Sequence, residues 1–191
     1  MIFLVNDKIK LIIFDLDSTI IDAETIDELA KAAGAGYEVQ KITEKAMSGE
    51  INFRESLIRR AALIKGLDLK TVEEVSKKLP LMPGAIETIK KLKQAGYKLA
   101  VVSSGFTIAV NIIKEKVGFD YAIANELLVN DGKLTGEIFG PIMDNCSKGK
   151  LLEEFAKKEG ILMENCAAVG DGANDACMLE KAGLGIAFNA K

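Results

Sequence analysis

The sequence predicts an α/β protein with a Rossmann-like parallel sheet core, an inserted four-helix cap and a small β-hairpin insertion. Three observations lead to this prediction. Short apolar segments that end in polar residues alternate with amphipathic segments, as in parallel sheets with crossover helices. Four helical segments follow one another between residues 22 and 82 without a strand, which indicates an inserted module. The sequence Asn-Asp-Gly-Lys at 130–133 separates two apolar stretches and predicts a hairpin turn.

The first strand is expected at residues 11–14, an apolar run that is too short for a helix and lacks the alternation of a half-exposed strand. The expected cap helices are 24–33, 38–47, 53–64 and 71–79. The expected core helices are 83–94, 106–117, 148–159 and 174–182, with strands at 97–102, 121–124, 166–169 and 184–188. These elements assign residues 1–21 and 83–191 to the core, about 125–142 to the hairpin insertion and 22–82 to the cap.

Composition excludes several classes of protein. With 191 residues the chain can build one substantial core, and a net charge of -3 with mixed signs argues against a nucleic-acid surface. The apolar runs are of strand length, so no membrane span is expected, and Met1–Val5 lacks the length and basic flank of a secretion signal. We therefore expect a cytoplasmic protein without nucleic-acid or membrane partners.

The histidine and cysteine contents narrow the chemistry. The chain has no histidine, which removes the usual serine triads, histidine phosphotransfer and zinc-histidine sites. Catalysis must then use carboxylates, lysine, serine or a hard metal ion. Cys146, Cys166 and Cys177 are odd in number and not closely spaced, so we expect unpaired thiols in a reducing cytoplasm.

Polar residues follow the predicted strands at four places. The four groups are Asp15 with Asp17, Ser103 with Ser104, Lys148, and Asp171 with Asn174 and Asp175. Because the carboxyl ends of parallel strands meet at one edge of the sheet, the four groups can converge on one pocket. Several carboxylates without histidine form an oxygen-rich site that suits Mg²⁺.

This inventory is suited to phosphoryl transfer. A divalent cation would keep Asp15 ionised and able to attack as a nucleophile. Asp17 lies two residues further on and would point to the same side of a regular strand, where it could donate and accept a proton. Lys148, the Ser103 hydroxyl and backbone amides at helix starts could hold the phosphoryl oxygens.

In order and spacing, Asp15-Leu16-Asp17-Ser18-Thr19, Ser103, Lys148 and Gly170-Asp171-Gly172-Ala173-Asn174-Asp175 resemble the four motifs of the haloacid dehalogenase superfamily of phosphatases. The resemblance covers nearly the whole chain. It implies Asp15 as nucleophile and Asp17 as general acid and base. It also implies Mg²⁺ held by Asp15, the backbone carbonyl of Asp17 and Asp171, with Asp175 supporting the metal shell. The residues implied to bind phosphate are Ser103, Lys148 and Asn174.

Within the superfamily the chain is most similar to the branch that hydrolyses phosphoserine, because Glu24, residues 47–53 and Arg60 match its substrate-recognition positions. The three arginines of the chain, at 54, 59 and 60, fall in one predicted helix, where 54 and 60 lie on different faces. A bidentate guanidinium suits a substrate carboxylate, and Glu24 suits an ammonium group. Phosphoserine carries both groups and is the expected substrate.

Two features depart from this branch. Ser104 occupies a position that is usually glycine, which adds a side chain beside the phosphate. The chain ends at Lys191, where the family usually continues with about one more strand and a helix, so we expect a bare sheet edge, covered in a homodimer, or a shortened chain. Two alternatives stay open: a phosphatase or phosphotransferase for another small phosphorylated metabolite, and a signalling module that accepts a phosphoryl group on aspartate.

Overall fold

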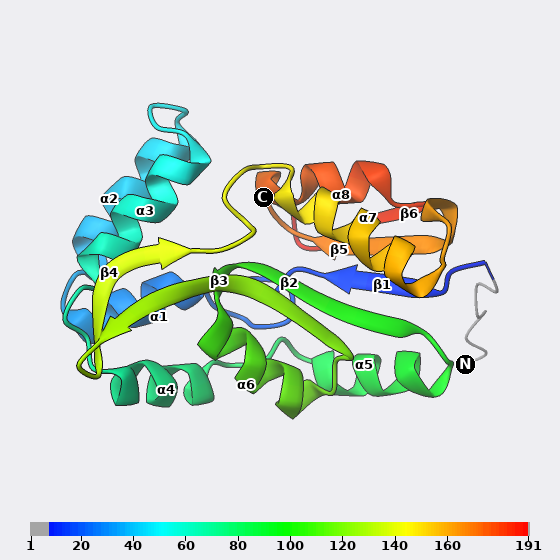
Figure 1. The fold of residues 1–191 in the computed structure, drawn as a ribbon, viewed down its shortest axis with the longest axis horizontal. Coiled ribbons are helices and arrows are strands. Elements are labelled where there is room, and N and C mark those ends of the chain that lie inside the picture. Colours follow the sequence, from blue (N-terminus) through cyan, green and yellow to red (C-terminus); the bar gives the residue numbers. More distant parts are fainter. Residues whose placement is uncertain (1–7, 191) are drawn as a thin grey trace.

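A six-stranded sheet with the order β4-β3-β2-β1-β5-β6 forms the centre of the computed structural model (Figure 1). The strands are β1 (Leu11–Phe14), β2 (Lys98–Phe106), β3 (Tyr121–Asn130), β4 (Lys133–Phe139), β5 (Cys166–Gly170) and β6 (Leu184–Ala187). Neighbouring strands are parallel except β3 and β4, which confirms the predicted fold class. The structure describes residues 8–190. Residues 1–7 lie outside it, and with them the part of the sequence that is assigned to the core and predicted to contain no secretion signal.

Two helical layers cover the parallel part of the sheet. Helices α5 (Ala85–Gln94) and α6 (Thr107–Val117) pack on one face, and α7 (Ser147–Glu159) and α8 (Ala176–Lys181) on the other (Figure 1). Side chains of β1 alternate between the layers: Ile12 and Phe14 face α5 and α6, while Leu11 and Ile13 face α7 and α8. Burial on both faces explains why this strand is apolar without alternation.

The predicted cap is present as four consecutive helices. They are α1 (Thr25–Ala33), α2 (Gly36–Met47), α3 (Phe53–Leu63) and α4 (Leu69–Lys78). Their apolar faces form a separate buried cluster, which also includes Phe106 of β2, Leu127 of β3 and Leu134 of β4. The strands of the hairpin therefore contribute to the hydrophobic core of the cap.

The two chain segments that join the cap to the sheet are paired with each other. The backbone N–H of Asp22 donates to the carbonyl of Pro80 at 2.9 Å, and that of Met82 donates to Ile20 at 2.9 Å. An antiparallel bridge between Ile21 and Leu81 lies between these two hydrogen bonds. The entry and exit of the cap thus form a short two-stranded ribbon.

The hairpin differs from its prediction in one respect. The sequence suggested a short third strand at 121–124 followed by a separate insertion, whereas β3 is one continuous strand that pairs first with β2 and then with β4. The strand continues past residue 124 because the Asn125 side chain is buried and hydrogen-bonded within the fold. The predicted turn is confirmed, because Asp131 and Gly132 both have positive φ angles, of 48° and 75°.

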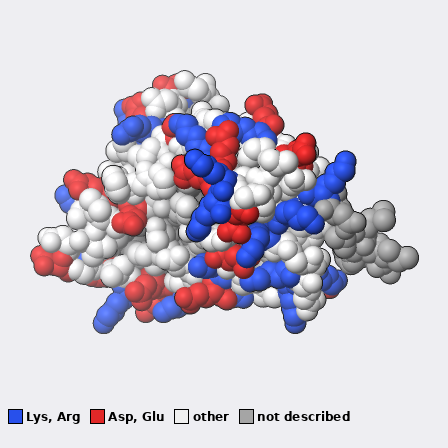
Figure 2. Space-filling view, turned by 45° about the vertical axis from the view of Figure 1, so that its right-hand side comes forward, with Lys and Arg blue, Asp and Glu red and all other residues white. Residues whose placement is uncertain are grey.

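The charged side chains on the face drawn in Figure 2 are of mixed sign. Lys and Arg side chains lie next to Asp and Glu side chains there, without a large patch of one sign. Over residues 8–190 we find no helix with the length and apolar character needed to cross a membrane.

The prediction of unpaired thiols was wrong for two of the cysteines. Cys146, which precedes α7, is disulfide-bonded to Cys177 of α8, with their Cα atoms 5.1 Å apart, and Cys166 is a buried free thiol. Sequence spacing could not indicate this pair, because the partners are 31 residues apart and meet only when α7 and α8 pack together.

Thiol titration tests this pairing. Protein unfolded in guanidinium without a reductant should show one reactive thiol, that of Cys166, and three after reduction. Cys146→Ser should release the thiol of Cys177 and add one to the unreduced count, while Cys166→Ser should remove the only one. Three thiols in unreduced wild-type protein would contradict the disulfide.

Candidate active site

A buried ion-pair network lies at the carboxyl end of β1. Asp15 directly follows this strand and is 4% exposed. The Nζ atom of Lys148, on α7, is 2.6 Å from Asp15 Oδ1 and 2.6 Å from Asp175 Oδ1. The parallel topology therefore brings together residues from three distant parts of the sequence, as the sequence predicted for this edge of the sheet.

The charges of this network perturb each other. Burial raises the pKa of Asp15 well above its ordinary value, Asp175 and Asp17 raise it further, and Lys148 acts against them. Burial alone would lower the pKa of Lys148, but its two carboxylate partners raise it above its ordinary value. Lys148 therefore carries its positive charge at neutral pH, whereas burial and the neighbouring carboxylates disfavour the charged form of Asp15.

Asp15, Asp171 and Asp175 form a cluster that can hold a metal ion. Each offers a carboxylate oxygen, and the three oxygens lie within 4.8 Å of one another. Three carboxylates against the single charge of Lys148 leave an excess of negative charge, which a divalent cation with a preference for oxygen ligands would neutralise. The donor set fits such an ion. Asp175, which the resemblance placed in a supporting role, contributes an oxygen to the cluster itself.

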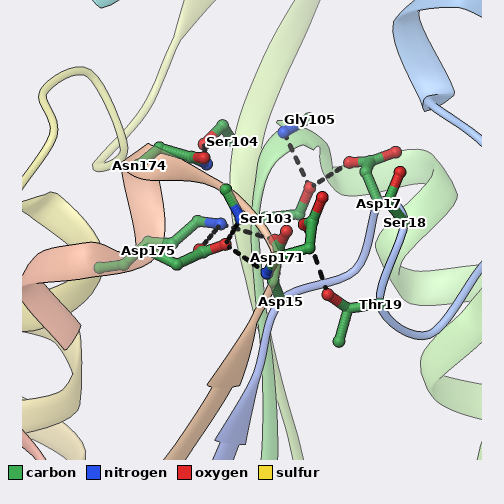
Figure 3. A network of polar contacts seen from close by, with 12 residues as sticks. Asp15, Asp17, Ser18, Thr19, Ser103, Ser104, Gly105, Asp171, Asn174 and Asp175 are labelled. Carbon is green, nitrogen blue, oxygen red and sulfur yellow. Dashed lines mark hydrogen bonds and ion pairs between the residues drawn. The ribbon is translucent and has the colours of Figure 1, made fainter. Parts of the chain in front are cut away.

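The Gly-Asp-Gly turn after β5 explains how Asp175 reaches this position. Its Oδ2 accepts hydrogen bonds from the backbone N–H groups of Asp171, at 3.1 Å, and Gly172, at 3.0 Å. A Cβ atom on Gly170 would lie 2.5 Å from the Asp175 carboxylate, so this close approach requires glycine. Asp171 lines the cavity described below, whereas Asp175, labelled with it in Figure 3, is fully buried and does not line it.

Asp17 does not point where a regular strand would place it. β1 ends at Phe14, and Ser18 has a left-handed φ of 56°, so the chain turns toward the cap. Asp17 Oδ1 accepts hydrogen bonds from the backbone N–H of Thr25 at 2.6 Å and from its hydroxyl at 2.5 Å. Thr25 is the first residue of α1, so the Asp17 carboxylate lies at the positive end of that helix.

The two predicted serines have different surroundings. Ser103 is fully buried, and its hydroxyl donates to Asp17 Oδ2 at 3.0 Å and accepts from the backbone N–H of Gly105 at 2.9 Å (Figure 3). The Ser104 hydroxyl lies at the cavity and accepts from Asn174 Nδ2 at 3.3 Å. Ser103 therefore orients Asp17, whereas Ser104, Gly105 and Asn174 line the space beside Asp15.

A cavity of about 790 Å³ opens from Asp15 toward the cap. The predicted residues that line it are Asp15, Asp17, Glu24, Arg60, Ser104, Asp171 and Asn174. Ser103 and Lys148 do not line the cavity but are buried and contact residues that do. Most of the predicted site residues thus line one cavity, some from the sheet and some from the cap.

Glu24 and Arg60 form the cap side of this cavity. Glu24 precedes α1 and accepts a hydrogen bond from the Ser18 hydroxyl at 2.7 Å. Burial lowers the pKa of Arg60, while Asp27, Glu24 and Asp17 act in the opposite direction. Arg54 and Arg59 of the same helix are exposed and do not line the cavity, in agreement with the prediction that one pocket would take only part of the arginine cluster.

Sequence reasoning missed four polar residues of this cavity: Asp27, Thr43, Ser56 and Asn145. Helical spacing could have indicated Asp27 and Ser56. Asp27 is three residues after Glu24 and Ser56 is four before Arg60, so each shares a helix face with a predicted residue. The Ser56 hydroxyl is the one buried side-chain polar atom in residues 8–190 for which no hydrogen-bond partner is found. No motif in the sequence indicated Asn145.

This chain belongs to the haloacid dehalogenase-like hydrolases, whose family model matches residues 9–183. The match spans β1 to β5, the cap and all four motifs around Asp15. The chain is therefore a hydrolase by family.

Among its relatives are phosphoserine phosphatases of two archaea. The enzyme of Methanocaldococcus jannaschii is 56% identical over 184 residues, which are 96% of this chain and 87% of that protein. The phosphoserine phosphatase of Archaeoglobus fulgidus is 54% identical over 186 residues. That match covers 97% of this chain, but the chain spans only about half, 54%, of that relative's length.

Solved structures agree with these relatives. A phosphoserine phosphatase described as a phospho-aspartyl intermediate analogue superposes with a TM-score of 0.90 at 56% identity, covering 96% of this chain and 88% of that one. A substrate-bound phosphoserine phosphatase complex superposes with a TM-score of 0.91 at 55% identity, covering 96% and 87%.

Proposed function

We propose that this protein is a Mg²⁺-dependent phosphomonoesterase that hydrolyses O-phospho-L-serine to serine and phosphate. The observation that carries the proposal is one cavity that Asp15 and Asp171 line from the sheet and that Glu24 and Arg60 line from the cap. Phosphoserine needs groups for a phosphate at one end and for an ammonium and a carboxylate at the other. The named activity of the archaeal relatives supports the same substrate.

Asp15 would act as the nucleophile. Its carboxylate oxygen attacks phosphorus while the bond from phosphorus to the serine oxygen breaks, which leaves an aspartyl phosphate on Asp15. Asp17 in its acid form gives its proton to the departing serine oxygen. Water then attacks the phosphorus, Asp17 takes the proton of that water, and phosphate leaves as the Asp15 carboxylate is restored.

The surrounding groups would stabilise the phosphoryl charge. Lys148 keeps a positive charge beside Asp15, and Ser104, Asn174 and the backbone N–H groups of this region offer donors to the phosphoryl oxygens. Asp15, Asp171 and Asp175 would hold Mg²⁺, with the Asp17 backbone carbonyl as a further ligand. When bound, the ion neutralises negative charge on the carboxylates and the phosphoryl group.

The cap would read the amino-acid part of the substrate. Arg60 can bind the carboxylate and Glu24 the ammonium group, since both line the cavity from the cap. We propose residues 22–82 as a cap that closes over the substrate to exclude water and opens to release serine. We also propose a cytoplasmic location and a homodimer. In the dimer a partner would cover β6, the exposed edge strand of the sheet.

A substrate panel tests the proposed function. Purified protein with Mg²⁺ should release phosphate from O-phospho-L-serine faster than from phosphoethanolamine, phosphoglycerate or sugar phosphates. Chelation by EDTA should abolish turnover, and Mg²⁺ should restore it. Equal rates on all esters would instead support a phosphatase for another small metabolite, and a single phosphorylation of the protein without turnover would support a signalling module.

Arg60→Ala is predicted to lower kcat/KM for phosphoserine about 100-fold, because the substrate carboxylate loses a buried charged partner. Phosphoethanolamine lacks the carboxylate, so its kcat/KM should change less than about threefold. Arg59→Ala is the matched control, since Arg59 lies on the same helix but pairs with Glu55 at the surface, at 2.5 Å. Steady-state kinetics on both esters provide the measurement, and an equal loss on both would refute carboxylate recognition by Arg60.

A further inference from the structure

Asn125 lies on β3 where the pairing of β2 with β3 becomes irregular. The register shifts between Ser103 and Phe106, so Ser104 and Gly105 bulge out of the regular ladder and toward the cavity. A bulge leaves backbone groups without their ladder partners. The Asn125 side chain replaces one of these partners, because its Nδ2 donates to the Ser104 carbonyl at 3.0 Å.

The same side chain also binds the segment that leads to Lys148. Asn125 Nδ2 donates to the carbonyl of Ile142 at 2.9 Å, and its Oδ1 accepts from the backbone N–H of Ile142 at 2.9 Å. This pair of bonds imitates the pairing of a neighbouring strand. Ile142 is itself buried, and the chain continues from it to the start of α7 at Ser147.

Gly140 makes this close approach possible. A Cβ atom at residue 140 would lie 2.4 Å from Asn125 Oδ1 and 2.7 Å from its Cα atom. The backbone of residues 140–142 can therefore come against Asn125 only with glycine at this position. Asn125 is fully buried, and both its donor and its acceptor atoms are used.

We propose that Asn125 is a positioning residue for phosphate binding. Its side-chain amide is bonded both to the bulge at Ser104 and Gly105 and to the segment that leads from Ile142 to Lys148. It therefore sets the distance between Ser104 and Gly105 on one side of the phosphate site and Lys148 on the other. Asn125 contacts neither Asp15 nor the cavity and acts only through backbone groups of Ser104 and Ile142. The inference rests on the proposed function for the phosphate end of the cavity and is independent of how serine is recognised.

The test compares Asn125→Ala with Thr107→Val. The Thr107 hydroxyl donates to the backbone carbonyl of Asn125 at 2.9 Å, so its removal disturbs the same stretch of β3 but leaves the bonds to Ser104 and Ile142 intact. The probe is inorganic phosphate with Mg²⁺, whose affinity is measured by calorimetry and by product inhibition. Asn125→Ala should weaken phosphate binding about tenfold or more, since three buried backbone groups lose their partners. Thr107→Val should keep the wild-type affinity within about twofold.

Kinetic data separate positioning from a general loss of structure. Asn125→Ala should raise KM for phosphoserine and for p-nitrophenyl phosphate by similar factors, while the preference for phosphoserine over phosphoethanolamine stays as in the wild type. A purely structural defect would instead reduce the active fraction and leave KM unchanged, which would overturn the proposal.

A second variant covers the case in which Asn125→Ala does not fold. Gly140→Ala keeps the Asn125 side chain but pushes a methyl group against its amide, and it should also weaken phosphate binding. If the folded variants bind phosphate as tightly as the wild type, Asn125 has no positioning role. A wild type that binds no phosphate would count against the proposed function itself, which distinguishes the two failures.

Discussion

Asp15→Asn is expected to abolish turnover and, at the same time, to stabilise the metal-free protein. Loss of the nucleophilic carboxylate should reduce kcat by about 10⁴-fold or more. The stability gain follows from burial, which raises the pKa of Asp15, with Asp175 and Asp17 adding to the effect. Asparagine occupies the same space without the buried negative charge, and Lys148 keeps Asp175 as its partner.

The gain should grow with pH. A carboxyl whose folded-state pKa is raised contributes full stability below its unfolded pKa, about 3.9, and loses it as pH rises through the folded value. Thermal melts of metal-free wild type and variant should therefore diverge from pH 4 upward. Asp22→Asn, which removes an exposed carboxylate seven residues away, should leave both stability and turnover unchanged. A variant less stable than the wild type at pH 8 would contradict this account.

Lys148→Met is expected to cost about 3–5 kcal/mol of unfolding free energy in the metal-free protein at pH 7, because two buried carboxylates lose their shared cation. The raised pKa of Lys148 means that its charge, and the stability that it provides, are fully present at neutral pH and are lost only in strong alkali. Urea unfolding measures the difference.

Two conditions should reduce that cost. Mg²⁺ should restore part of the stability by neutralising Asp15 and Asp175, and acid should do so by protonating them. Lys150→Met is the matched control, because Lys150 lies two residues further along α7 and pairs with Asp144 at the surface, at 3.3 Å. A cost below about 1 kcal/mol for Lys148→Met would place this ion pair among weak surface pairs instead.

Much of the fold could be predicted from local patterns. The β1 strand is apolar because both of its faces are covered, and the cap helices have apolar residues at helical spacing because each buries one face. The site was also predictable in outline, since motifs at the ends of parallel strands must meet. Asp15, Lys148 and Asp171 converge for this topological reason.

What the sequence did not reveal depends on where side chains turn after the strands end. Asp17 points toward α1 because the chain leaves the strand at Phe14, and no pattern in the sequence marks that turn. The predicted strand ended at residue 124, before Asn125, whereas β3 continues through it because long-range partners satisfy its polar side chain. Its partners at Ser104 and Ile142 are distant in sequence and come together only in the folded chain.

The ribbon between Ile21 and Leu81 has a consequence for any motion of the cap. Two separate flexible tethers would let the cap drift and twist, but hydrogen bonds join these two segments side by side. Any motion of the four helices as a unit must then bend this ribbon or break its bonds. It must also break, or move together with, the backbone hydrogen bonds that join Gly66, Leu67 and Leu69 to the hairpin. Asp17 lies shortly before the first segment of the ribbon and is hydrogen-bonded to Thr25 shortly after that segment, so bending of the ribbon would act on the stretch of chain that holds this carboxylate.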